Sequence, residues 1–122
     1  MVFFSKVYPK DKVFVGIPDR LDWTRSQQNC EWLGWRLASA ESSSLMNRTV
    51  ALMQNNDYWL GATKESGVWS WFSGAVMSTP PTEDSGGTFL LMWNGSLDDA
   101  SGTDENMHVC KITFKLWHSV SQ

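Results

Sequence analysis

The chain has 122 residues, of which 42% are hydrophobic and 19% are charged, and its net charge is -3. These values are typical of one folded domain and exclude an intrinsically disordered chain. The negative charge argues against a nucleic-acid partner, because phosphate binding needs clustered Lys and Arg. No apolar run is long enough to span a membrane. We therefore predict a single domain over residues 1–122, with no nucleic-acid site and no membrane span.

The first predicted elements are a strand and a helix. Residues 13–15 form an apolar run that predicts a strand ending at Gly16. Asp22 stands where the N-cap of a helix is favoured, and Gly34 suits the position just after its end. Between these two residues, four side chains recur at helical spacing and predict one buried face: Trp23, Ser26, Cys30 and Leu33.

A second helix is predicted from about Ser42 to Gln54, and the polar residues 55–57 end it. Its predicted apolar stripe consists of Leu45, Met46, Val50, Leu52 and Met53. The segments after this helix are short and rich in aromatic and aliphatic residues, as strands are. These predicted strands are residues 58–60, 68–72, 89–92 and 108–112, with a turn-rich segment over residues 78–87. Two helices followed by strands indicate an α+β fold, not repeated βαβ units.

Acidic residues dominate the second half of the chain. Between Lys64 and Lys111 there is no basic residue, whereas seven residues are acidic: Glu65, Glu83, Asp84, Asp98, Asp99, Asp104 and Glu105. One interpretation is an ordinary solvated face. The other is a surface that attracts a metal cation or a basic partner.

Cys30 and Cys110 are the two cysteines, and no Cys or His spacing in the chain matches a zinc site. They form either a disulfide, which requires an oxidising compartment, or two buried free thiols. The sequons at Asn47 and Asn94 are glycosylation candidates and agree weakly with secretion. Residues 1–6 lack the apolar stretch of a signal peptide, so we expect any secretion signal to have been removed already.

The first half of the chain carries a specific resemblance. The helix around Cys30, the turn at Gly34 and the strand Tyr58-Trp59-Leu60-Gly61 resemble the opening half of a C-type lectin-like domain. The resemblance covers roughly residues 13–112 and is more diffuse in the second half, where Trp69, Trp71 and Gly74 match an aromatic strand and turn. It implies two helices flanking short, mostly antiparallel sheets with a long irregular loop region.

The resemblance also carries expectations about cross-links and metal. It implies a Cys30–Cys110 disulfide, and the family's usual second disulfide is missing at Thr88 and Gly102. Sugar-binding members hold calcium through a Glu-Pro-Asn type loop and a Trp-Asn-Asp element. Here Pro81 matches the loop proline but Pro80 and Thr82 replace its oxygen-bearing neighbours, and the resemblance leaves both cis and trans open for the Pro80-Pro81 bond. The later element reads Leu97-Asp98-Asp99. Any metal site would therefore use Asp98 and Asp99, helped by Glu83 or Asp84, and we expect weak calcium binding or none.

Two functions follow as hypotheses. The first is a secreted or extracellular recognition domain, or the ectodomain of a surface protein, that binds a carbohydrate or glycoprotein through its long-loop face. Its candidate contacts are Glu83, Asp84, Trp93, Asn94, Asp98 and Asp99. Trp93 is a stacking candidate, although a core position at a strand end is the more common role for such a residue. The second is a calcium-independent domain that binds a protein receptor with a basic patch.

Other functions are weaker. A structural or ice-surface role occurs in some relatives, but no specific residue here supports it. No nucleophile elbow, catalytic triad order or phosphate loop is present, so we expect a protein that is not an enzyme. After Cys110, apolar and polar residues alternate, which predicts that the last strand continues. That tail can pair with residues 2–4, which we favour, or form the interface of a homo-oligomer.

Overall fold

A computed structural model describes residues 12–112 of the chain. Within that range the elements are β1 (Phe14–Leu21), α1 (Trp23–Trp32), β2 (Arg36–Leu37), α2 (Ser43–Met53), β3 (Tyr58–Glu65), β4 (Val68–Trp71), β5 (Phe89–Trp93), β6 (Ser96–Ala100) and β7 (Asn106–Lys111). All seven strands of this part of the chain join one sheet in the order β1-β7-β3-β5-β6, with β2 on β7 and β4 on β3. The pairings are antiparallel except for β3 with β7. The predicted α+β class is confirmed.

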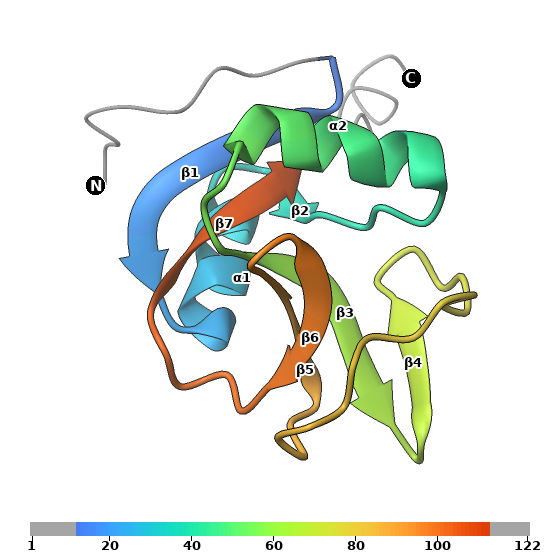
Figure 1. The fold of residues 1–122 in the computed structure, drawn as a ribbon. Coiled ribbons are helices and arrows are strands. Elements are labelled where there is room, and N and C mark those ends of the chain that lie inside the picture. The colour runs from blue at the N-terminus through green and yellow to red at the C-terminus, as the bar shows by residue number, and fades with distance from the viewer. Residues whose placement is uncertain (1–11, 113–122) are drawn as a thin grey trace, which may run out of the picture.

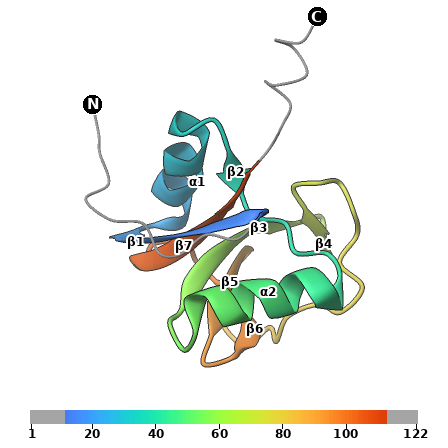
Figure 2. The ribbon, with the colours of Figure 1, turned by 90° about the horizontal axis from the view of Figure 1, so that it is seen from above.

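The two helices cover opposite faces of the sheet, as the view from above shows most clearly (Figures 1 and 2). Each face therefore has its own apolar cluster. Met53 of α2 lies in one cluster with Tyr58 and Leu60, whereas Cys30 of α1 lies in the other with Trp59. Tyr58, Trp59 and Leu60, successive residues of β3, thus point to alternate faces and are all fully buried. This burial on both faces explains why the strand reads as a continuous apolar run.

Both helices begin and end where local sequence signals place them. Asp22 caps α1 by accepting a hydrogen bond from the Arg25 backbone N–H at 2.8 Å. Ser42 caps α2 in the same way through the Leu45 N–H at 3.1 Å. The N-cap prediction at Asp22 and the predicted start of the second helix near Ser42 are confirmed, and both side-chain oxygens satisfy backbone donors that the first helical turn leaves unpaired.

Two local predictions are wrong. β1 does not end at Gly16 but continues to Leu21, because β7 pairs with it along that length. On α2, Val50 is exposed and Thr49 is fully buried instead. The Thr49 hydroxyl lies 2.9 Å from the Tyr58 hydroxyl. This polar pair, and not Val50, therefore lies on the buried face of the helix. The predicted pairing of the tail with residues 2–4 falls outside the described residues.

Gly61 lets β3 approach the backbone of residues 37–38 closely. A Cβ at this position would lie 2.3 Å from the Leu37 carbonyl oxygen and 2.9 Å from the Phe72 ring. The Gly61 N–H donates to the Ala38 carbonyl at 2.6 Å, which such a side chain would prevent. The glycine that ends the Tyr58-Trp59-Leu60-Gly61 motif is thus required by backbone contact.

Cys30 and Cys110 form the predicted disulfide, with a Cα–Cα distance of 5.5 Å. It joins α1 to β7, two elements that are 80 residues apart in the sequence. Both cysteines are fully buried, so the cross-link lies inside the α1-side core.

His108 is a fully buried residue of β7 beside this cross-link. Its Nε2 atom lies 2.9 Å from the Asn29 side-chain nitrogen on α1, while Nδ1 has no hydrogen-bond partner among residues 12–112. Burial lowers the pKa of His108 to about 4, and a backbone contact with Asp19 opposes this only in part. The ring is therefore neutral in the folded protein at neutral pH.

We expect the folded state to lose stability as the pH falls from about 6.5 to about 4. In that range the unfolded chain protonates His108, whose ordinary pKa is 6.5, whereas the folded chain does not. The free energy of unfolding should be about 2 kcal/mol lower at pH 5 than at pH 8. Denaturant titrations at several pH values measure this loss. A His108→Gln variant should be nearly flat between pH 8 and pH 5, and an unchanged slope in that variant would contradict the assignment.

Candidate functional site

The β5–β6 hairpin presents the first part of the site. Its turn is Asn94-Gly95, whose φ angles of 50° and 82° suit the left-handed turn that joins two antiparallel strands tightly. The registered pair on either side of the turn is Trp93 and Ser96. Sequence reasoning missed β6, although the Asn-Gly pair beside an apolar run was the available hairpin signal.

Trp93 is exposed at this turn. Its exposed fraction is 52%, whereas Trp59 and Trp71 are core residues that are 0% and 4% exposed. The Trp93 side chain borders a shallow cavity of about 130 Å³ together with Thr82, Asp84, Asn94, Ser96, Leu97 and Asp98. An indole ring and several oxygen acceptors therefore share one small hollow.

The long loop between β4 and β5 closes the other side of this cavity. Thr82 lies against β6, where its N–H donates to the Leu97 carbonyl and its own carbonyl accepts from the Asp99 N–H, each at 3.2 Å. Pro81 is buried beside this contact, and its peptide bond with Pro80 is trans. The loop residue that replaces the family's asparagine is thus held by backbone pairing with a strand.

Asp99 organises the rest of the loop. The residue is 3% exposed, and its carboxylate accepts hydrogen bonds from the backbone N–H groups of Asp84, Ser85 and Gly87 at 3.2, 3.3 and 2.9 Å. Burial alone would raise the pKa of Asp99, but these donors outweigh it and the pKa is lowered. The carboxylate is therefore charged and already satisfied by the protein itself.

The Glu83 carboxylate pairs with donors on β3 and β4. One of its oxygens lies 2.7 Å from Lys64 Nζ and accepts a hydrogen bond from Trp69 Nε1, also at 2.7 Å. These two donors lower the pKa of Glu83, the hydrogen bond from Lys64 most strongly. The sequence suggested an acidic stretch with no cation to neutralise it. For Glu83 this is wrong, because the folded chain places Lys64 beside its carboxylate.

Three carboxylates do gather: one oxygen from each of Asp84, Asp98 and Asp99 lies within 4.8 Å of the others. Burial, and then the negative charge of Asp84, raise the pKa of Asp98. Calcium needs six to eight oxygen ligands, however, and Asp99 spends both oxygens on backbone donors while Asp98 accepts from the Asp99 N–H at 2.9 Å. This donor set does not fit a tight calcium site, and the place of Glu83 in the predicted ligand set is taken by Asp84.

We expect Asp99→Asn to loosen the long loop. An asparagine keeps one acceptor oxygen but turns an NH₂ group toward backbone donors, leaving at least one N–H unpaired. The cost should be about 2 kcal/mol of unfolding free energy, with faster amide exchange at Ser85 and Gly87. Denaturant titration and hydrogen exchange measure both effects. Asp104→Asn, at an exposed residue outside the cluster, is the control. Unchanged exchange in the Asp99 variant would show that the loop is held by other contacts.

The chain is similar in sequence to known proteins. Residues 19–112 match the family model described as the lectin C-type domain. The human protein named C-type lectin domain family 2 member D is 33% identical over 64 residues, which is 52% of this chain and 34% of that protein. The chain thus matches about a third of this relative's length.

Solved structures agree in fold. A calcium-dependent type II antifreeze protein, solved in its calcium-free form, has a TM-score of 0.74 at 21% identity, covering 89% of this chain and 98% of its own. A calcium-independent type II antifreeze protein also has a TM-score of 0.74, at 18% identity, covering 92% and 95%. Both structures confirm the predicted C-type lectin-like fold.

One further finding concerns membranes. Among residues 12–112, no helix is both long enough and apolar enough to cross a bilayer.

Proposed function

This chain is a member of the C-type lectin domain family, and from that premise we propose an extracellular recognition domain that binds a carbohydrate or glycoprotein through its long-loop face. The observation that carries the proposal is the half-exposed Trp93 ring beside a hollow lined by Thr82, Asp84 and Asp98. The apolar face of a sugar ring packs on the indole, and its hydroxyl groups donate to the carboxylates.

We propose that this face works without a calcium bridge. Asp99 and Thr82 already hold the loop through backbone hydrogen bonds, and the Lys64–Glu83 ion pair anchors it to β3. The task that a metal would perform, fixing the loop, is therefore performed by contacts within the chain. A preorganised surface also loses less conformational entropy when a ligand binds.

Secretion and glycosylation belong to the same proposal. A buried disulfide suits an oxidising compartment, and Asn47 and Asn94 are both exposed to solvent. Their consequences differ, because Asn94 lines the Trp93 cavity whereas Asn47 lies on α2. A glycan on Asn94 would cover the proposed binding face, and a glycan on Asn47 would leave it open.

The test is a glycan array probed with unglycosylated protein, in calcium and again in chelator. We expect binding that survives the chelator and falls at least about tenfold in Trp93→Ala. Trp32→Ala is a matched control, since Trp32 is also an exposed tryptophan (66%) but lies at the end of α1. Binding that disappears in chelator, or that persists in Trp93→Ala, would overturn this proposal.

A calcium-independent protein-binding domain is the second candidate. It is favoured by Asp84 and Asp98, which leave uncompensated negative charge on the same face. The partner would be a protein with a basic patch, and association would slow as salt is added. No glycan binding, together with salt-dependent binding to a basic partner that Asp84→Asn weakens, would favour this candidate over the first.

A further inference from the structure

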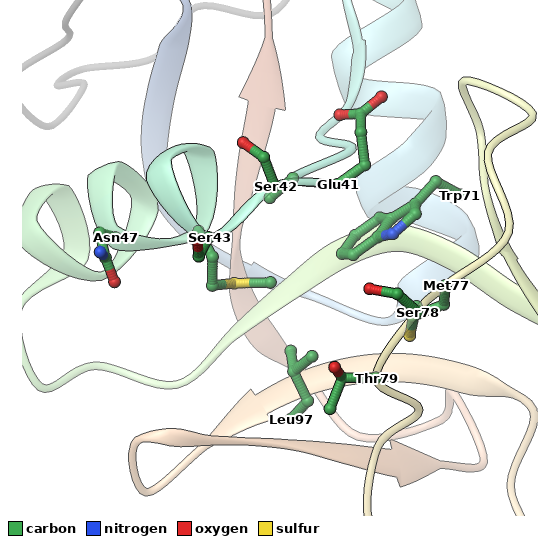
Figure 3. Close-up of a pocket in the computed structure, with 11 residues that line it drawn as sticks. Glu41, Ser42, Ser43, Asn47, Trp71, Met77, Ser78, Thr79 and Leu97 are labelled. Atoms are coloured by element: carbon green, nitrogen blue, oxygen red, sulfur yellow. The ribbon is translucent and has the colours of Figure 1, made fainter.

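A separate cleft of about 540 Å³ opens between the start of α2 and the segment 77–79 (Figure 3). Its volume lies within the range of about 300–1,000 Å³ that is usual for small-molecule sites. Neither Trp93 nor the carboxylates Asp84, Asp98 and Asp99 line it. The cleft is therefore distinct from the proposed long-loop site, although Leu97 of β6 borders both.

The base of the cleft is apolar. Trp71 and Met77 are buried core residues, 4% and 6% exposed, and the partly buried Met46 and Leu97 pack against the same cluster. In Figure 3 the Trp71 ring extends into the space between α2 and residues 77–79, and Leu97 points toward it from β6. Methionine side chains adapt to ligands of differing shape, so this surface suits a small apolar ring or short chain.

Within the described part of the chain, the rim of the cleft is polar and carries no positive charge. Ser43, Asn47, Ser78 and Thr79 are exposed residues that offer hydroxyl and amide groups, each able to donate and to accept hydrogen bonds. No Lys or Arg is among the lining residues, so an anion would be desolvated there without a counter-charge.

Glu41 is the charged residue among those that line the cleft, and its carboxylate pairs with Lys111. Its carboxylate lies 3.6 Å from Lys111 Nζ and turns away from Leu97 and Thr79 in Figure 3. Burial would raise the pKa of Glu41, but a hydrogen bond from Ser73 and the charge of Lys111 lower it overall. A cationic ligand therefore gains little from this carboxylate, which already has its own cation.

We propose that this cleft binds a neutral amphipathic small molecule. Its apolar ring or chain contacts Met46, Trp71 and Met77, and its hydroxyl groups meet the serine, threonine and asparagine side chains of the rim. This site goes beyond the proposed function, because it uses none of the residues assigned to the long-loop face. The two sites can therefore be tested, and can fail, independently.

The test uses hexyl β-glucoside below its micelle concentration, with hexanoate and hexylammonium as charged molecules of the same chain length. Isotope-labelled methionine methyl groups report binding by NMR. We expect saturable shifts at Met46 and Met77 but not at Met53 and Met107, which do not line the cleft. The glucoside should bind more than about tenfold tighter than either charged analogue. No shift at Met46 and Met77, equal shifts at all methionines, or tighter binding of a charged analogue would overturn the proposal.

Substitutions in and outside the cleft test where the glucoside binds. Ser78→Trp should fill the cleft from one side and Ser43→Trp from the other, each weakening glucoside binding more than about tenfold. Gln28→Trp, at an exposed residue of α1 on the opposite face of the sheet, is the control and should bind normally. Trp93→Ala should also bind normally, which separates this site from the long-loop face. Methyl spectra confirm that each variant is folded, and full binding by a folded Ser78→Trp or Ser43→Trp protein would overturn the proposal.

Discussion

The double variant Cys30→Ala, Cys110→Ala is expected to lose about 4–5 kcal/mol of unfolding free energy. The bond closes a loop of 80 residues, and in the chain-entropy model such a cross-link acts by restricting the unfolded state. Because the disulfide and the Asn29–His108 side-chain contact both join α1 to β7, detachment of α1 from the sheet should accompany the loss.

Denaturant titration of both proteins, with and without reductant, measures the effect. Reductant should destabilise the natural chain by a similar amount and leave the double variant unchanged, which controls for side effects of the two substitutions. Thiol labelling in denaturant without reductant should find no free cysteine. Labelling of both cysteines, or equal stability of the two proteins, would show that the cross-link does not form.

Trp59→Ala is expected to cost about 3–5 kcal/mol of unfolding free energy. Trp59 is fully buried at the centre of the sheet, where it is registered with Leu91 of β5 and His108 of β7. Its Nε1 atom also donates to the Leu21 carbonyl at 2.9 Å. Truncation therefore leaves a large cavity and removes this hydrogen bond.

The thermal midpoint should fall by about 4 °C for each kcal/mol in a domain of this size. Trp59→Phe should lie between the natural chain and the alanine variant, because it keeps most of the packing but loses the hydrogen bond to Leu21. Trp32→Ala, at an exposed position, should change stability by less than about 0.5 kcal/mol. An unchanged melting temperature in Trp59→Ala would exclude the central role assigned to this side chain.

Together these residues separate the stability of the domain from its proposed recognition role. The disulfide and Trp59 lie in the α1-side core, whereas Trp93 and Asp84 lie on the exposed end formed by the β5–β6 hairpin and the long loop. Variants at the second pair should therefore alter binding while the domain stays folded. This division allows a lost binding signal to be read as a lost contact.

Local chemistry was sufficient to predict several features of the fold. Asp22 and Ser42 cap the two helices because a short polar side chain satisfies nearby N–H groups, an interaction that spans only three residues. The continuous apolar run that begins β3 reflects burial on both faces of one sheet. The pairing of Cys30 with Cys110 followed from the family resemblance that these local motifs carry.

The chemistry of the candidate site depended on contacts between distant segments. Nothing near Glu83 in the sequence shows that Lys64 and Trp69 will reach it, or that Asp99 will bind the backbone of residues 84–87. Trp93 is exposed because β6 turns back beside β5, and the same pairing brings Asp98 and Asp99 against the loop. The family resemblance and the local charge pattern made these carboxylates candidate metal ligands. Only the tertiary structure decides which of them the protein has already satisfied, because a carboxylate accepts whichever donors the folded chain places within hydrogen-bond distance.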